Sequence, residues 1–323
     1  MPDRLAVDVA QPAPCYTRLV MSDLRALKHR YLTYLETQWG GSAKMIENYD
    51  RYLERFLRFA KVKHPRDITE ERVASFRLYL TKQPGANIGG EIASMKQRTQ
   101  NYYLIALRMF LKYLIAEGYE TLPPNGVQLA KLPRQSYDRI SPTELACLRA
   151  APDRKTIEGK RDHAILELLC STGVRTSELC ALSIEQIDLM SNEFLVGGTD
   201  QSSRTVYLSD TARAALSDYL QARTDDSPAL FIRYGRKANN GSDLRIHARA
   251  VQRMLKHYTK IVGITSSVTP HSIRHTFADE LIQHGADVRS VQTLMGHTSI
   301  YSTQVYRPNT KVQVPKTNKS PRQ

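Results

Sequence analysis

A proline-broken stretch near residue 130 divides the chain into two parts. The segment YETLPPNGVQLAKLPRQSYDRI, residues 119–140, has three prolines, several basic residues and no helical repeat of apolar positions. Proline fixes φ and removes a backbone donor, so such a stretch favours an irregular connection over a helix or a strand. A chain of 323 residues is also longer than one hydrophobic core usually covers. The sequence therefore predicts two domains joined by a linker over residues 122–138.

The part before the linker has the pattern of a helical bundle. Apolar residues recur at helical spacing in four segments, residues 22–39, 42–62, 69–82 and 96–118. Ser22 and Thr69 are expected N-caps, and Gly118 is an expected helix-terminating glycine. The intervening QPGANIGGE, residues 83–91, reads as a loop. We expect a helical domain over residues 22–121, preceded by a flexible arm over residues 1–21.

The part after the linker mixes helices with one short β-hairpin. Ser141 and Glu144 form an expected capping box at the first helix, with Pro142 between them. Two short β-like runs, residues 192–198 and 203–209, are separated by a polar turn and predict a hairpin. Helical patterns cover residues 160–174, 175–189, 210–224, 245–262, 269–285, 287–297 and 300–307. The expected fold class is mainly α with a small β-hairpin, ending in a basic tail over residues 311–323.

The charge balance favours a polyanionic partner. Lysine and arginine outnumber aspartate and glutamate by 46 to 32, a net charge of +14. DNA, RNA and an anionic membrane surface all fit this balance. Phosphate neutralisation with counterion release makes DNA contact the favoured use of the polar faces of the first helices. These faces carry Lys28, Arg30, Lys44, Arg51, Arg55, Arg58, Lys61, Lys63, Lys96 and Arg98.

Other sequence features bear on location and on the cysteines. No apolar run reaches the 18 residues of a membrane span, and the N-terminus lacks the pattern of a secretory signal. The four cysteines show no Cys-x-x-Cys pair, which favours free thiols over zinc or disulfides. We expect a cytoplasmic, nucleoid-associated protein.

The segment HSIRHTFADELIQHGADVRSVQTLMGHTSIYSTQVY, residues 271–306, gathers side chains that can do chemistry. A helix that begins at Pro270 places His271 in its first turn, where unpaired N–H groups attract anions. Arg274 lies three residues on and shares a face with His271. His297 follows a glycine at an expected helix end, and Tyr306 lies nine residues further.

A metal site is a weaker interpretation of the same segment. His271 and His275 have i, i+4 spacing and could share an ion. No acidic third ligand accompanies them in a recognisable motif, and Arg274 between them would repel a cation. The sequence predicts no metal and no cofactor.

Four stretches in the second part, TGVRTSEL, HSIRHTFA, LMGH and STQVY, resemble the C-terminal signatures of tyrosine recombinases, the phage integrases and Xer-type enzymes. The family's order is an arginine, a hairpin lysine, His-x-x-Arg, a histidine or tryptophan, and a tyrosine. Arg175, His271, Arg274, His297 and Tyr306 follow this order. The resemblance covers roughly residues 22–310 and implies a helical core-binding domain followed by a catalytic domain over residues 139–310.

The resemblance implies a reaction as well as a fold. Tyr306 would attack a DNA phosphodiester and form a 3′-phosphotyrosine intermediate with a free 5′-hydroxyl. Arg175 and Arg274 supply planar donors suited to the phosphate oxygens. His271 can exchange a proton with the phenol, and His297 can donate a hydrogen bond to the phosphate.

Further implications concern the neighbours of these residues and the assembly. Glu178 is expected to orient its neighbour Arg175. Tyr301 is a rival nucleophile, but the setting Thr303-Gln304-Val305-Tyr306 favours Tyr306. Resemblance to the family also implies double-stranded DNA as partner and a homo- or hetero-tetramer on two DNA sites.

The hairpin turn departs from the family pattern. The family has GKGxKxR, with its first lysine as acid to the leaving oxygen, whereas this chain has GTDQSSRTVYL with Thr199 at the lysine position. No lysine occurs between Lys160 and Lys237. Either Arg204 or another residue serves instead, or cleavage is impaired. A guanidinium is a poor proton donor because it hardly deprotonates.

Three functions remain open from the sequence. The first is a site-specific recombinase or integrase, and the short N-terminal arm favours an Xer-like layout. The second is a DNA-binding architectural or regulatory protein with a recombinase fold and weak or lost catalysis, which the missing lysine supports. The third is a topoisomerase-like strand nicker, which shares the chemistry without partner-strand exchange.

Overall fold

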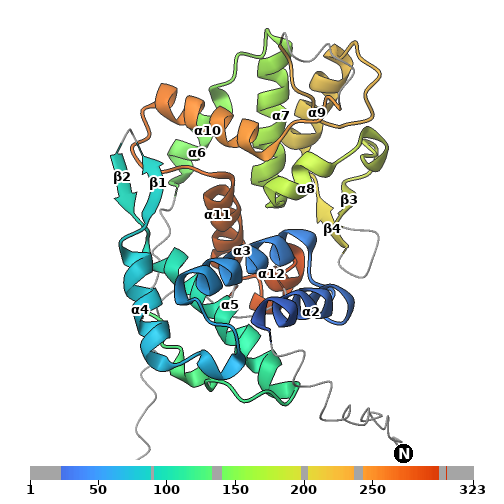
Figure 1. Cartoon of the computed structure of the whole chain (residues 1–323). Coiled ribbons are helices and arrows are strands. Elements are labelled where there is room, and N and C mark those ends of the chain that lie inside the picture. The colour runs from blue at the N-terminus through green and yellow to red at the C-terminus, as the bar shows by residue number, and fades with distance from the viewer. Residues whose placement is uncertain are drawn as a thin grey trace, which may run out of the picture. The chain divides into compact units, whose positions relative to one another are not determined.

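The structure is a computed structural model that describes residues 23–88, 91–132, 140–197, 203–235, 243–297 and 303. The chain forms two compact units, residues 1–134 and 135–323 (Figure 1). Each unit has a hydrophobic core of its own. Among the described residues, no helix combines the length and apolar character that crossing a membrane requires.

The first unit is a helical bundle, as the apolar periodicity predicts. Its helices are α2 (Leu24–Thr37), α3 (Ala43–Ala60), α4 (Glu70–Thr81) and α5 (Gln97–Ala116), with 3-10 turns η1 (Pro65–Asp67) and η2 (Pro124–Gly126). Helices α2, α3 and α4 all pack on α5, the longest of them. Asp23 caps α2, and Thr69 caps α4 as expected. The expected cap Ser22 and the arm over residues 1–21 lie outside the described residues.

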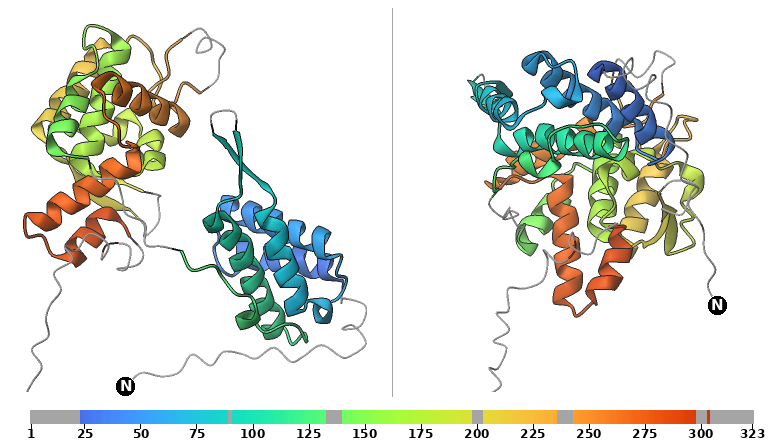
Figure 2. Two further views of the ribbon diagram at one scale, coloured as in Figure 1. Left: turned by 90° about the vertical axis from the view of Figure 1, so that its left-hand side faces the viewer. Right: turned by 60° about the horizontal axis from the view of Figure 1, so that its bottom comes forward.

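The loop predicted over residues 83–91 is wrong. This stretch contributes to an antiparallel hairpin of β1 (Pro84–Ile88) and β2 (Glu91–Ser94), which extends from one end of the bundle (Figure 2). The ladder pairs Ile88 with Glu91 and Pro84 with Ser94, with an irregularity between them. Backbone hydrogen bonds form the ladder, so apolar alternation is not required. Two glycines separate the strands in sequence, which is the length of a tight hairpin connection.

The first part of the predicted linker packs on α5. Val127 is buried, and its carbonyl accepts a hydrogen bond from Arg108 Nε at 2.6 Å. Asn101 binds both backbone groups of Ala130, at 2.9 and 3.0 Å. The end of the stretch, residues 133–138, lies outside the described residues.

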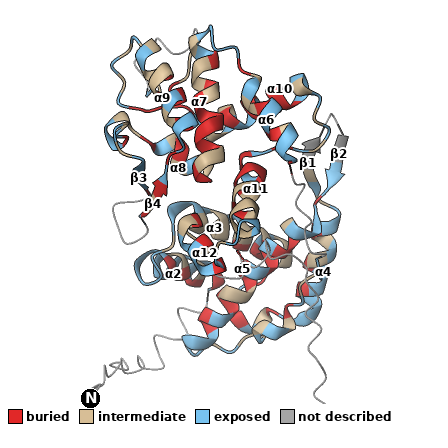
Figure 3. Ribbon diagram, turned by 180° about the vertical axis from the view of Figure 1, so that it is seen from behind, coloured by how far each residue is buried: buried red, intermediate tan, exposed pale blue. Residues whose placement is uncertain are grey.

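The second unit surrounds the apolar helix α7 (Ile157–Thr172), whose central part is buried (Figure 3). Helices α6 (Pro142–Ala150), α9 (Asp210–Ala222) and α11 (Pro270–Gln283) pack on α7. The capping box of Ser141 and Glu144 is present at α6, and Thr269 caps α11 with Pro270 in its first turn. The remaining elements are α8 (Thr176–Ala181), η3 (Ile184–Gln186), α10 (Ala248–Val262) and α12 (Val288–Met295).

The predicted hairpin of the second unit is confirmed as β3 (Glu193–Val196) and β4 (Arg204–Tyr207). Its inward positions alternate with outward ones, as expected for a sheet with one covered face. Phe194 and Val206 face inward, and so does the charged Arg204. Strand β4 also packs on α12, which brings Arg204 to the end of that helix.

Candidate active site

Arg175 lies in the short connection between α7 and α8. Gly173 caps the C-terminal end of α7 with φ of +59°, and a Cβ there would collide with the ring of Phe277. The turn therefore requires glycine for both its backbone and its packing. Arg175 is the residue before α8, and Glu178 accepts hydrogen bonds from its backbone N–H and from Nη1, both at 2.7 Å. The Arg175 side chain remains 41% exposed, so a ligand can reach it.

Arg274 reaches the same place from the first turns of α11. Its Nη1 donates to the carbonyl of Gly173 at 2.5 Å, and its Nη2 donates to the carbonyl of Met295. Arg175 Nη2 donates to the next carbonyl, that of Gly296. The last carbonyls of a helix have no intrahelical partner, so the ends of α7 and α12 hold both guanidiniums. Arg274 is only 3% exposed, whereas Arg175 is the more accessible of the two.

His271 lies beside His275 on α11, with ring centroids 4.1 Å apart in an edge-to-face arrangement. Burial lowers the pKa of His271, and the positive charges of Arg274 and Arg175 lower it further. Burial, His271 and Arg274 lower the pKa of His275 to about 4. Both imidazoles are therefore neutral near pH 7. The ring of His271 is partly desolvated, but the residue as a whole is still open to solvent, so its neutral imidazole is suited to accept a proton.

His297 follows the C-terminal glycine of α12. Its Nδ1 lies 2.9 Å from the hydroxyl oxygen of the buried Thr303, three residues before Tyr306. Burial lowers the pKa of His297 to about 4, with further contributions from the charges of Arg274, Arg175 and Arg204. When the Thr303 hydroxyl donates to Nδ1, the ring proton is on Nε2, which then becomes a donor.

The structure brings Arg175, Glu178, His271, Arg274 and His297 to the joined ends of α7, α11 and α12. Tyr306, Tyr301 and Thr199 lie outside the described residues, as does the tail over residues 311–323. The helix predicted over residues 300–307 is described only at Thr303.

Sequence reasoning missed the place of Arg204 in this site. The sequence indicates Arg204 only as a substitute for the missing lysine. Its Nη1 and Nη2 bind the two carboxylate oxygens of Glu178 at 2.7 and 2.8 Å, and its Nε binds the carbonyl of Leu294 at 2.7 Å. Burial alone would raise the pKa of Glu178, but Arg204 and Arg175 lower it to about 2. Glu178 is therefore an ionised carboxylate between two guanidiniums.

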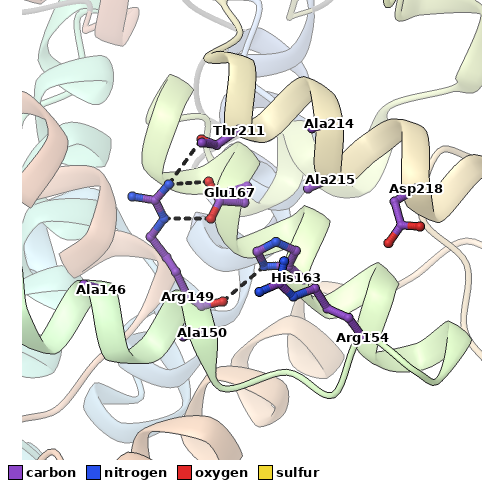
Figure 4. A pocket seen from close by; sticks show the side chains of 10 residues that line it. All are labelled: Ala146, Arg149, Ala150, Arg154, His163, Glu167, Thr211, Ala214, Ala215 and Asp218. Atoms are coloured by element: carbon purple, nitrogen blue, oxygen red, sulfur yellow. Dashed lines mark hydrogen bonds and ion pairs between the residues drawn. The ribbon is translucent and has the colours of Figure 1, made fainter.

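A cavity of about 560 Å³ lies elsewhere in the second unit, lined by residues of α6, α7 and α9 (Figure 4). Several of its polar groups bind one another: Arg149 pairs with buried Glu167 at 2.5 Å and lies 3.2 Å from the Thr211 hydroxyl. His163 Nδ1 lies 3.1 Å from the carbonyl of Arg149. This cavity is separate from the predicted catalytic residues. Over the described ranges, no group of three or more histidine, cysteine or acidic side chains could hold a metal ion.

Ion pairs occupy part of the basic face predicted on the first unit. Lys28 binds Asp50 at 2.8 Å and Glu54 at 2.7 Å, and Arg58 also binds Glu54, at 2.7 Å. Lys44 and Arg30 have acidic partners as well. Part of this basic face is therefore already paired with acidic side chains in the protein without DNA.

Comparison with known proteins identifies the family. The model of the phage integrase family matches residues 138–312, and that of the phage integrase N-terminal SAM-like domain matches residues 29–118. Tyrosine recombinase XerC of Thermodesulfovibrio yellowstonii is 33% identical over 288 residues, which cover 85% of this chain and 89% of that protein. Tyrosine recombinase XerC of Bacillus pumilus is 33% identical over 309 residues, covering 92% and 96%.

Solved structures support the fold. The integrase of transposon Tn1549, solved with a circular intermediate DNA, matches with a TM-score of 0.68 over 89% of this chain and 95% of that one, at 15% identity. A lambda integrase dimer bound to a core site matches with a TM-score of 0.65 over 96% and 85%, at 16% identity.

These matches define the class of protein as an enzyme that cleaves and rejoins DNA. The chain belongs to the phage integrase family, the tyrosine recombinases. Its activity is site-specific recombination, in which DNA is cleaved and rejoined. The alternative of a DNA-binding architectural or regulatory protein with weak or lost catalysis is not favoured.

Proposed function

We propose that the chain recombines double-stranded DNA at specific sites through a covalent bond between Tyr306 and a 3′-phosphate. The observation that carries this proposal is the convergence of Arg175, Arg274 and His297 on the ends of α7 and α12. His297 also contacts Thr303, close in sequence to Tyr306. Covalent trapping on a nicked suicide duplex, in which the cleaved strand cannot be rejoined, tests the proposal.

We assign a separate role to each of the two units. Residues 22–121 form the core-binding domain, residues 139–310 form the catalytic domain, and residues 122–138 connect them. The relatives are named XerC, and solved structures of similar fold contain integrases on DNA. We propose a homo- or hetero-tetramer on two DNA sites, with the protein associated with the nucleoid in the cytoplasm.

The reaction is a transesterification. The phenol oxygen of Tyr306 forms a bond to phosphorus, and the bond from phosphorus to the 5′-oxygen breaks. His271 takes the phenolic proton. It can do so because its lowered pKa leaves the imidazole neutral near pH 7. The new phosphodiester retains the energy of the old one, so the reverse attack by a 5′-hydroxyl of the partner strand rejoins the DNA.

Charge on the phosphate determines the role of the remaining side chains. The transition state places negative charge on the non-bridging oxygens, where donors held in advance by the protein stabilise it most. Arg175 and Arg274 face these oxygens, and His297 donates from Nε2. The carbonyls of Gly173, Met295 and Gly296 hold the two guanidiniums before DNA binds.

Delivery of a proton to the leaving 5′-oxygen is the expected weak point, because Thr199 replaces the family's lysine. A substrate with sulfur at the bridging 5′ position needs little proton delivery, since a thiolate leaves unprotonated. We expect the unchanged protein to cleave the sulfur substrate much faster than the oxygen substrate. Thr199→Lys should raise the oxygen rate and narrow this difference, as measured by single-turnover cleavage of both substrates.

Thr205→Lys, on β4 beyond the turn, is the control and should leave the difference unchanged. Equal rates of the unchanged protein on both substrates would show that another acid already serves. No gain from Thr199→Lys would show that the turn does not lie at the leaving group.

DNA affinity should fall steeply with salt, because a protein of net charge +14 replaces counterions on the phosphate backbone. The expected result is a strongly negative slope in a plot of the logarithm of the association constant against that of salt concentration. Fluorescence anisotropy with a labelled duplex measures this slope. A slope near zero between low and moderate salt would contradict phosphate contact as the source of affinity.

A further inference from the structure

Arg204 is the most buried charged side chain at the candidate active site that the reaction above does not use. It lies at the start of β4, on the inward face of the hairpin beside Val206, and its side chain is 7% exposed. A buried guanidinium is costly unless its donors are satisfied. All three nitrogens of Arg204 donate, two to Glu178 and one to the carbonyl of Leu294.

These contacts link Arg204 to both sides of the site. Through Glu178, whose two oxygens also bind Arg175, it fixes the orientation of Arg175. Through Leu294, it holds the end of α12 just before His297. A Cβ on Gly296 would lie 3.2 Å from Arg204 Cδ and 3.4 Å from Arg175 Nη1, so the two arginines pack under this glycine.

Arg204 also sets the charge at the site. The group of Glu178, Arg175 and Arg204 has one net positive charge. Without Arg204, the pair of Glu178 and Arg175 would have no net charge. A phosphate with two negatively charged oxygens in the transition state is stabilised by the first arrangement more than by the second.

We propose that Arg204 is a positioning residue for DNA cleavage: it holds Glu178 against Arg175 and fixes the end of α12 that carries His297. It does not touch the phosphate and does not protonate the leaving oxygen. The proposal rests on the proposed role of Arg175 as a phosphate donor.

The test compares Arg204→Met and Arg204→Lys with a matched variant far from the site. Arg223 is the match, since its side chain is 4% exposed, pairs with Asp225 and donates to backbone carbonyls. Both methionine variants lose a buried ion pair, so their melting temperatures show how much stability each has lost, and anisotropy shows whether each still binds DNA. The single-turnover cleavage rate on the suicide duplex then measures the effect of each substitution on the chemical step.

We expect Arg204→Met to slow cleavage by about tenfold relative to Arg223→Met, less than the loss on removing a phosphate donor itself. The cleavage rate of Arg204→Lys should lie between that of Arg204→Met and that of the unchanged protein, since lysine keeps the charge but loses the bidentate contact with Glu178. Equal rates for Arg204→Met and Arg223→Met would overturn the proposal.

A double-mutant cycle separates positioning from a direct role. If Arg204 acts mainly through Arg175, Arg204→Met should cost much less in an Arg175→Ala protein than in the unchanged one. An undiminished cost there would overturn the part of the proposal in which Arg204 acts through Glu178 and Arg175. The bridging-sulfur substrate gives a second readout: the Arg204→Met defect should persist on it, whereas rescue by sulfur would make Arg204 the acid.

Failure of the underlying function gives a different result. If Arg175→Ala by itself cleaves at the normal rate, the phosphate-donor role of Arg175 is wrong, whatever Arg204 does. If Arg175→Ala is slow and Arg204→Met is normal, only the positioning role is wrong.

Discussion

Replacement of Tyr306 by phenylalanine should abolish covalent attachment to DNA and leave DNA affinity near that of the unchanged protein. In the proposed mechanism the phenol oxygen is the nucleophile, so its removal leaves no atom to bond to phosphorus. The ring remains, and the arginines and histidines that we propose as phosphate donors are unchanged. Denaturing gel electrophoresis of the protein with a suicide duplex measures attachment, and anisotropy measures affinity.

Tyr301→Phe is the matched control, because it removes the same atom from the neighbouring tyrosine. It should form the covalent adduct at a rate close to that of the unchanged protein. An adduct that survives in Tyr306→Phe and disappears in Tyr301→Phe would assign the nucleophile to Tyr301. An adduct that survives in both variants would contradict a tyrosine nucleophile at either position.

Replacement of Arg175 or Arg274 by alanine should slow cleavage by roughly a hundredfold or more, the loss expected for one preorganised donor to the transition state. Lysine at either position should restore little, because a point charge cannot reproduce two parallel N–H donors. Arg274→Ala should also lower stability, since it removes contacts to the carbonyls of Gly173 and Met295. Single-turnover rates at saturating protein measure the effect on chemistry alone.

Arg213→Ala is the control for this pair, because it removes an arginine that pairs with an exposed carboxylate, that of Asp210. Its cleavage rate should stay close to that of the unchanged protein. Near-normal rates for both Arg175→Ala and Arg274→Ala would exclude these two residues as the donors to the phosphate.

The fold was predictable where apolar periodicity and helix caps coincide. Thr269 before Pro270 placed the start of α11, and so placed His271 and Arg274 on adjacent turns. Ser141 with Glu144 placed α6 in the same way. Such local signals suffice because a cap and an apolar stripe are both encoded within a few residues.

The hairpin of β1 and β2 was not predictable from the same signals. Its strands contain Pro84, Gly85 and Asn87, which usually interrupt regular structure. Hydrogen bonds between the two strands stabilise the hairpin despite these residues. The composition of either strand alone does not indicate this pairing. The two glycines at residues 89–90 were the available signal.

The contacts of Arg204 were also beyond local reasoning, since Glu178 and Leu294 are distant from it in sequence. One signal was available. Arg204 and Val206 alternate along a predicted strand and so share a face, and a charged residue on the apolar face needs a partner. Glu178, the acidic residue nearest to Arg175 in sequence, was the candidate partner for Arg204.

The central claim is that Tyr306 forms the bond to DNA, and mapping the covalent adduct tests it most directly. The unchanged protein would be trapped on a suicide duplex and digested with protease, and the DNA-linked peptide would be sequenced by mass spectrometry. We expect the link on Tyr306, to a 3′-phosphate, with a free 5′-hydroxyl on the other side of the break. A link to any other residue, or a 5′-phosphate link, would contradict the account.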